Sequence, residues 1–114
     1  MSDCLCCKIV AGEIPSKKAY EDELVYAFYD IAPQAPVHVL VIPKKHIASL
    51  NAATAEDQQL LGKVLLTIQK IAAEQGIAEK GYRVVTNCGE QGGQTVMHLH
   101  FHLMGGREML WPAG

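Results

Sequence analysis

The chain has 114 residues, of which 49% are hydrophobic and 19% charged; this predicts one folded globular domain and excludes a disordered chain. The formal net charge of −2 provides no basic surface, so we expect no nucleic acid and no acidic membrane among its partners. Since no apolar run is long enough to span a membrane and no signal-peptide pattern is present, we expect a cytoplasmic protein with reduced cysteines.

The first part of the chain predicts a short helix followed by three strands. Residues 4–11 have a helical pattern, and Asp3 is placed to cap its start. Two short strands are predicted over residues 19–21 and 24–29, with an acidic turn between them. The run 37–42 is rich in β-branched residues and is bounded by prolines, which predicts a buried strand.

The second part predicts a long amphipathic helix and two more strands. Residues 54–57 (Thr-Ala-Glu-Asp) resemble a capping box, and the helix that follows is predicted to end at Gly76. Apolar residues on one stripe predict its core face: Leu60, Leu61, Val64, Leu65, Ile68, Ile71 and Ala72. Strands are predicted over residues 82–87 and 98–104. This order of elements favours an α+β domain with an antiparallel sheet.

Residues 97–104 hold three of the five histidines, in strict alternation with apolar residues. An extended chain would place His98, His100 and His102 on one face and the apolar side chains on the other. Residues two apart lie about 6.6 Å from each other and residues four apart about 13 Å, so the three imidazoles cannot share one metal ion without a bend. Histidine titrates near neutrality, so this face is a candidate reaction centre. The alternative is a strand with a solvent-exposed histidine stripe.

A glycine-rich segment, residues 87–96, leads directly into the histidine strand. Gly92 and Gly93 let backbone amides approach an anion closely, and Gln94 and Thr95 add side-chain donors. A Gly-Gly pair alone is a common turn signal. Because this loop continues into three histidines, we expect it to hold a phosphate group beside His100.

The run from His98 to Met104 resembles the His-φ-His-φ-His-φ-φ signature of the histidine triad (HIT) superfamily. Three further segments are similar to its Hint branch: residues 30–38, 41–46 and 105–112. The resemblance implies one HIT domain over residues 1–114, with an α+β fold built from a five-stranded antiparallel sheet and two helices. It also implies a homodimer whose sheets join into one ten-stranded sheet. We expect the tail residue Trp111 to pack across that interface.

The resemblance implies hydrolysis of purine nucleoside phosphoramidates and aminoacyl-adenylates through a nucleotidyl intermediate on His100, with no cofactor required for catalysis. The substrates would be AMP or GMP derivatives. The family's other catalytic positions match His102 at the phosphate, His38 in the proton relay and Thr95 near the leaving group. Its nucleotide-binding positions match Asp30 at the ribose, Asn87, Gly93 and Gln94 at the phosphate, and Ile9, Phe28 and Ile31 at the base. The chemistry of imidazole is consistent with this mechanism, because imidazole is a good nucleophile toward phosphorus and its phosphoryl adduct still reacts with water.

Most of these supporting residues also have a simpler explanation when the resemblance is left aside. Asp30 and Asn87 are typical turn residues. His38 lies in an apolar strand, where a single histidine is more often a hydrogen-bonded core residue. The three apolar residues of the base pocket are ordinary core residues by type. Their assignment to a nucleotide site therefore depends on the family pattern.

Cys4 and Cys7 have Cys-x-x-Cys spacing, and on a first helical turn both sulfur atoms can reach one tetrahedral ion. The resemblance to bacterial-type members implies a structural zinc site completed by His46 and His98. That would give His98 a role separate from catalysis. The alternative is that the two cysteines are small buried apolar residues, and the neighbouring Cys6 leaves the choice of thiol open.

Other functions remain open on the sequence. One is a nucleotide-binding scaffold protein with residual turnover, and another is a metal-dependent protein that uses the histidine strand itself. A nearer enzymatic alternative is dinucleoside polyphosphate hydrolysis, as in the Fhit branch. The sequence leaves open the physiological substrate, its leaving amine and the choice between adenosine and guanosine.

Overall fold

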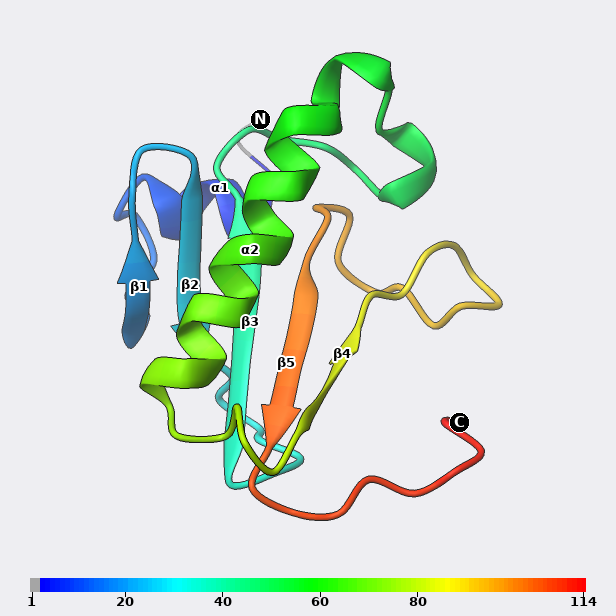
Figure 1. Ribbon diagram of the computed structural model, residues 1–114. Helices are drawn as coiled ribbons and strands as arrows, with labels where there is room; N and C mark the ends of the chain where they lie inside the picture. Colours follow the sequence, from blue (N-terminus) through cyan, green and yellow to red (C-terminus); the bar gives the residue numbers. More distant parts are fainter. Residues whose placement is uncertain (1–2) are drawn as a thin grey trace.

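The computed structural model describes residues 3–114 as a five-stranded antiparallel sheet with one helix on each face (Figure 1). The strands are β1 (Lys18–Glu21), β2 (Val25–Tyr29), β3 (Val37–Pro43), β4 (Tyr82–Val85) and β5 (Phe101–Gly105), in the order β1-β2-β3-β5-β4. The helices are α1 (Leu5–Val10) and α2 (Gln58–Glu74), with short 3₁₀ turns at Leu50–Ala52 and Ala55–Asp57. This confirms the predicted α+β fold. The single domain over residues 1–114 stays a prediction, and its first two residues lie outside the described ones.

The sheet separates two apolar clusters. The larger packs α2 against one face and includes Ala27, Val39, Val41, Val64, Ile68, Ile71, Phe101 and Leu103. The smaller packs α1 against the other face and contains Cys6, Ile9, Tyr26, Phe28 and Ile42. Because side chains alternate along a strand, His38 and His102 lie on the α1 face of β3 and β5. The α1 face is therefore the one that carries the candidate catalytic histidines.

The predicted start and end of the long helix are confirmed. The capping box is formed, with the Thr54 amide donating to the Asp57 carboxylate at 2.9 Å, and Gly76 follows the helix with a φ of +77°. Leu65 was predicted in the core, but it is 52% exposed. The buried face is centred on Val64, Ile68 and Ile71, and Leu65 lies about 100° around the helix from Val64. The buried stripe of α2 is therefore narrower than predicted.

Three local predictions need correction. Cys4, not Asp3, caps α1, because its Sγ accepts the amide of Cys7 at 3.3 Å. The strand predicted over residues 82–87 ends at Val85. The strand predicted over 98–104 begins only at Phe101, since the Leu99 amide donates to the Ile47 carbonyl at 2.6 Å and bends the chain away from the sheet. None of the described helices is long and apolar enough to cross a membrane.

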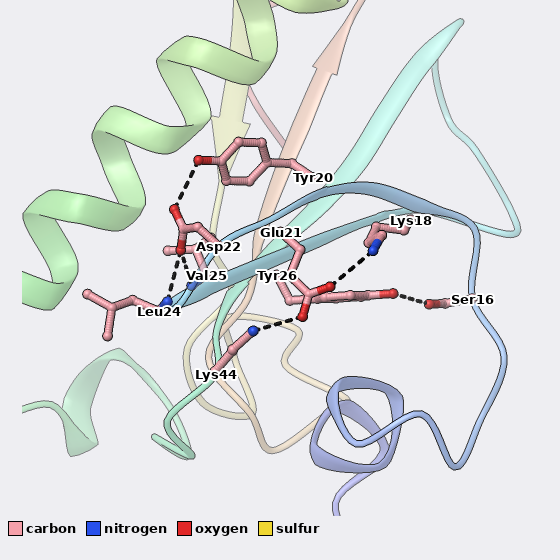
Figure 2. A network of polar contacts seen from close by, with 9 residues as sticks. All are labelled: Ser16, Lys18, Tyr20, Glu21, Asp22, Leu24, Val25, Tyr26 and Lys44. Carbon is pink, nitrogen blue, oxygen red and sulfur yellow. Dashed lines mark hydrogen bonds and ion pairs between the residues drawn. The ribbon is translucent and has the colours of Figure 1, made fainter.

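A polar network holds the turn between β1 and β2 (Figure 2). The Asp22 carboxylate accepts bonds from the amides of Leu24 and Val25, from the Tyr20 hydroxyl and from the Lys63 ammonium, all at 2.9–3.0 Å. Because Lys63 belongs to α2, the network ties the hairpin to the long helix. On the other face, the hydroxyls of Ser16 and Tyr26 share a hydrogen bond of 2.7 Å, which fastens the loop after α1 to β2.

Candidate active site

A pocket of about 610 Å³ opens on the α1 face of the sheet. Much of its lining is apolar and comes from α1, the loop after it, β2, β3 and the segment before β5: Leu5, Cys6, Ile9, Ile14, Phe28, Leu40 and Val96. Its polar lining includes Asp30, Asn87, Thr95, His100 and His102, with Ser16, Lys17 and Tyr29. The three residues predicted for a base pocket, Ile9, Phe28 and Ile31, all line it. Ile31 is completely exposed and therefore lies at the rim.

His100 is held in one tautomer by the backbone. Its Nδ1 lies 2.6 Å from the carbonyl oxygen of His98. A carbonyl oxygen only accepts hydrogen bonds, so Nδ1 carries the proton and Nε2 carries the lone pair. Since His100 lines the pocket, its unprotonated nitrogen is available for chemistry there.

His102 is held by a chain of hydrogen bonds that begins at a backbone amide. The Gln34 N–H donates to Nδ1 of His38 at 3.0 Å, so the proton of His38 is on Nε2. That Nε2–H donates to Nδ1 of His102 at 2.9 Å, which places the single N–H of His102 on Nε2. Burial lowers the pKa of His102, and repulsion from His100 and His38 acts in the same direction. His102 is therefore a neutral donor, whereas His100 presents a lone pair.

Asp30 follows β2 directly and approaches the same histidines. Its Oδ2 lies 3.4 Å from Nε2 of His38, and its Oδ1 accepts the Ala32 amide at 2.8 Å. Atoms of Asp30, His38 and His102 lie within 4.8 Å of one another, a spacing that a metal ion could also use. However, the His38 nitrogen in this group carries a proton and has no free lone pair. The arrangement favours a proton relay over a metal site.

The glycine loop is stabilised by its own hydrogen bonds. A Cβ on Gly92 would lie 2.3 Å from the carbonyl oxygen of Cys88, so only glycine fits there. The amides of Gly93 and Gln94 donate to loop carbonyls. The Gln94 side chain bonds the loop backbone at Gly89 and Val96 and also the Ala48 carbonyl in the segment after β3. Asn87 donates to Gly92 at 2.7 Å. Of the predicted phosphate ligands, Asn87 and Gly93 line the pocket, as does Thr95, whereas the side chain of Gln94 is buried and holds the loop in place.

A second cluster lies between α1 and the end of β3, and it brings together the four predicted metal ligands Cys4, Cys7, His46 and His98. Nδ1 of His98 is 3.3 Å from Sγ of Cys4, 3.7 Å from Sγ of Cys7 and 3.2 Å from Nδ1 of His46. Nε2–H of the fully buried His98 donates to the Pro43 carbonyl at 2.8 Å, so its Nδ1 presents a lone pair to the cluster. Burial also lowers the pKa of His98, which keeps the ring neutral and able to bind a metal.

Cys6 takes no part in this cluster. It lies on the other side of α1, in the apolar lining of the pocket, where burial raises the pKa of its thiol to about 12. Of the three clustered thiols, those of Cys4 and Cys7 lie with His46 and His98, and that of Cys6 does not.

Residues 11–109 match the HIT domain family. The chain belongs to this family. A HIT-like protein of Synechococcus elongatus is 61% identical over 107 residues, which cover 94% of this chain and 93% of the relative. A protein of Escherichia coli named purine nucleoside phosphoramidase is 50% identical over 102 residues, covering 90% of this chain and 86% of the relative. A HIT family hydrolase of Legionella pneumophila has a solved structure with a TM-score of 0.97 and 51% identity, covering 98% of this chain and 100% of that one.

Sequence reasoning missed several residues of the HIT pocket. Leu40 had a usable signal, because it lies two residues after His38 on the same strand and therefore on the same face. No sequence signal marked Leu5, Ile14 or Val96 as pocket residues, since by residue type each is an ordinary core residue. The Gln34 amide, which fixes the tautomer of His38, also had no signal, because every non-proline residue carries such a donor.

Proposed function

We propose that this HIT protein hydrolyses the P–N bond of purine nucleoside phosphoramidates, and related aminoacyl-adenylates, with His100 as the nucleophile. The observation that carries the proposal is the bond from Nδ1 of His100 to the His98 carbonyl, which leaves Nε2 unprotonated on a pocket-lining side chain. The name of the Escherichia coli relative supports the substrate class.

In the proposed reaction, Nε2 of His100 attacks phosphorus and the bond to the amine breaks. His102 keeps its proton: its Nε2–H donates a hydrogen bond to a phosphoryl oxygen while its Nδ1 stays bonded to His38. The leaving amine takes a proton from the solvent as the P–N bond breaks. The His98 carbonyl stabilises the positive charge that develops on the His100 ring. Water then attacks the nucleotidyl-His100 adduct, the bond between phosphorus and Nε2 breaks, and the nucleotide leaves while the proton released by the water returns to the solvent. No metal or organic cofactor enters these steps.

The rest of the pocket suits a nucleotide. We place the base among Ile9, Phe28 and Ile31, and the ribose hydroxyls on Asp30, since carboxylates commonly accept bonds from a ribose diol. The phosphate would lie beside Asn87 and the Gly93–Gln94 segment, with Thr95 near the leaving group.

The charge of the pocket argues against dinucleoside polyphosphates as the main substrates. Among its described lining residues, Lys17 is the only lysine or arginine, and Lys17 lies over the ring of Tyr29, which precedes Asp30. A polyphosphate chain carries several negative charges that such a lining would leave largely uncompensated. A single phosphoryl group with one charge needs only the neutral donors present. A scaffold protein would not require the matched tautomers of His100 and His102.

The test is hydrolysis of adenosine and guanosine 5′-phosphoramidates by the wild type and by His100→Ala. We expect the variant to lose at least about 100-fold in kcat while it still binds AMP, because the base and ribose contacts remain. Mass spectrometry of acid-quenched wild-type reactions should find the nucleotidyl adduct on the peptide that contains His100. Met104→Leu, two residues beyond His102 on β5, is the matched control and should keep its activity. Unchanged turnover in His100→Ala would refute the proposal.

We also propose that Cys4, Cys7, His46 and His98 bind a structural zinc ion. A tetrahedron with zinc–sulfur bonds of about 2.3 Å and zinc–nitrogen bonds of about 2.0 Å has edges of about 3.3–3.8 Å. Four of the six ligand–ligand distances in the cluster are 3.2–3.7 Å, which fits this ion. The ion would join α1 to the segments after β3 and before β5. Elemental analysis of protein purified without a chelator should find about one zinc per chain, and a zinc content near zero would exclude the site.

Finally, we propose a cytoplasmic homodimer formed through β4. This strand ends the sheet, and its side chains Tyr82 and Val84 are exposed. The tail lies beside it, because Arg83 donates to the Leu110 carbonyl at 2.7 Å, and Leu110 and Trp111 expose a large apolar area. A second β4 would pair the free strand edge and extend the sheet to ten strands. Light scattering should give a dimer mass at micromolar concentration, and a monomer mass would refute this assembly.

A further inference from the structure

The Asp30 carboxylate lies where the pocket meets the histidine relay. Its side chain is 18% exposed, whereas that of His38 is 3% exposed, so one carboxylate reaches both the pocket and a buried imidazole. One oxygen is occupied by the Ala32 amide at 2.8 Å. The other lies 3.4 Å from Nε2 of His38. In addition, the Asp30 amide donates to the His38 carbonyl at 3.0 Å, which fixes the two residues relative to each other.

Both sides of the His38 ring favour the same tautomer. On one side, the Gln34 N–H requires Nδ1 to be an acceptor. On the other side, a proton on Nε2 is attracted to the Asp30 carboxylate as well as to Nδ1 of His102. In the opposite tautomer, a lone pair would face the carboxylate and an N–H would face the Gln34 amide, and both contacts are repulsive. Asp30 and Gln34 thus act on His38 together.

The tautomer of His38 determines which nitrogen of His102 can donate. With a proton on Nε2 of His38, Nδ1 of His102 is an acceptor and its own proton is on Nε2. In the opposite tautomer of His38, His102 would have to donate from Nδ1, and Nε2 would lose the proton that bonds the phosphoryl oxygen in the proposed reaction. The charge of Asp30 therefore influences this hydrogen-bond donor through one intervening ring.

We propose that Asp30 is a positioning residue for the His38–His102 pair in addition to being a sugar ligand. Ribose recognition and the hydrogen bond from His102 to the phosphoryl group would then depend on one carboxylate. The inference rests on the proposed function for its kinetic consequence, but the hydrogen bonds that support it do not depend on the substrate. A residue that only binds the sugar would affect KM, and only with substrates that carry ribose hydroxyls.

The kinetic experiment compares adenosine 5′-phosphoramidate with its 2′,3′-dideoxy counterpart, using the wild type and Asp30→Asn. We expect kcat of the variant to fall about 10-fold with both substrates, since the Gln34 amide still acts on His38. KM should rise only with the ribose substrate. Asp22→Asn is the matched control, because Asp22 also accepts backbone amides in a turn but lies outside the pocket lining. An unchanged kcat with the dideoxy substrate would overturn the proposal.

A second measurement needs no turnover, and its first part needs no variant. Long-range ¹H–¹⁵N NMR spectra of the imidazoles report which ring nitrogen is protonated, and the wild type should show His38 protonated on Nε2. Asp30→Asn should shift His38 toward a mixture of tautomers. A wild-type His38 protonated on Nδ1 would overturn the proposal even if the variant fails to fold. If the wild type does not cleave phosphoramidates, the proposed function fails, while the NMR result still decides the role of Asp30.

Discussion

Replacing Asp22 by asparagine tests the network that ties the β1–β2 turn to α2 (Figure 2). Partial burial raises the pKa of the Asp22 carboxyl, but the bonds from Lys63, the Leu24 and Val25 amides and the Tyr20 hydroxyl outweigh it. The net effect holds the pKa well below its usual range. Asparagine keeps one acceptor oxygen and loses the charge.

The magnitude follows from the donors that are affected. The two amides exchange charge-assisted bonds for neutral ones, and the Tyr20 hydroxyl loses its carboxylate acceptor. Solvent screens the exposed Lys63 ammonium, so we assign it no part of the loss. We expect Asp22→Asn to lower the free energy of unfolding by about 1–2 kcal/mol at pH 7. Because the folded pKa lies below the unfolded value of about 3.9, this contribution is fully present above that value and is lost as the pH falls toward the folded pKa.

Urea unfolding followed by circular dichroism at pH 7 and pH 3.5 checks the prediction. The difference between wild type and Asp22→Asn should be smaller at the lower pH, which lies just inside the window where the contribution is lost. Glu23→Gln, which removes the next carboxyl of the same turn on an exposed side chain, should change little at either pH. A destabilisation equally large at both pH values would show that the charge of Asp22 is not its source.

Two further predictions concern the pocket walls. Chelation of the proposed zinc should weaken AMP binding about 10-fold by calorimetry, because the ion would hold α1 through Cys4 and Cys7, and the α1 residues Cys6 and Ile9 line the pocket. Cys88→Ser is the control, and equal affinity before and after chelation would contradict the prediction. Gly92→Ala should lower kcat/KM at least about 10-fold, since its Cβ would lie 2.3 Å from a backbone oxygen and displace the loop that carries Thr95. The control is Gly62→Ala, in an open helical position, which should leave kcat/KM unchanged. An unchanged kcat/KM in Gly92→Ala would show that the loop is not part of the site.

The sequence by itself determined the features that depend on local backbone geometry. Alternation along residues 100–104 assigned Phe101 and Leu103 to the core and His102 to the opposite face, because a strand has a period of two. The ends of the α2 region were also readable, since Thr54 and Asp57 form a capping box on the 3₁₀ turn that leads into α2, and Gly76 accepts a positive φ. The proposed zinc ligands Cys4 and Cys7 followed from their spacing, but His46 and His98 were assigned only through the family resemblance.

The tertiary structure alone decided how distant segments meet. His98 leaves the histidine face because the Leu99 amide pairs with Ile47, a residue 52 positions earlier, and this bend turns its ring toward Cys4 and Cys7. The tautomers of His38 and His102 depend on the Gln34 amide and on the approach of Asp30, neither of which has a sequence signature. Such contacts depend on the paths of loops and on the register of strands. Local propensities do not specify either, because they act over one turn or one strand at a time.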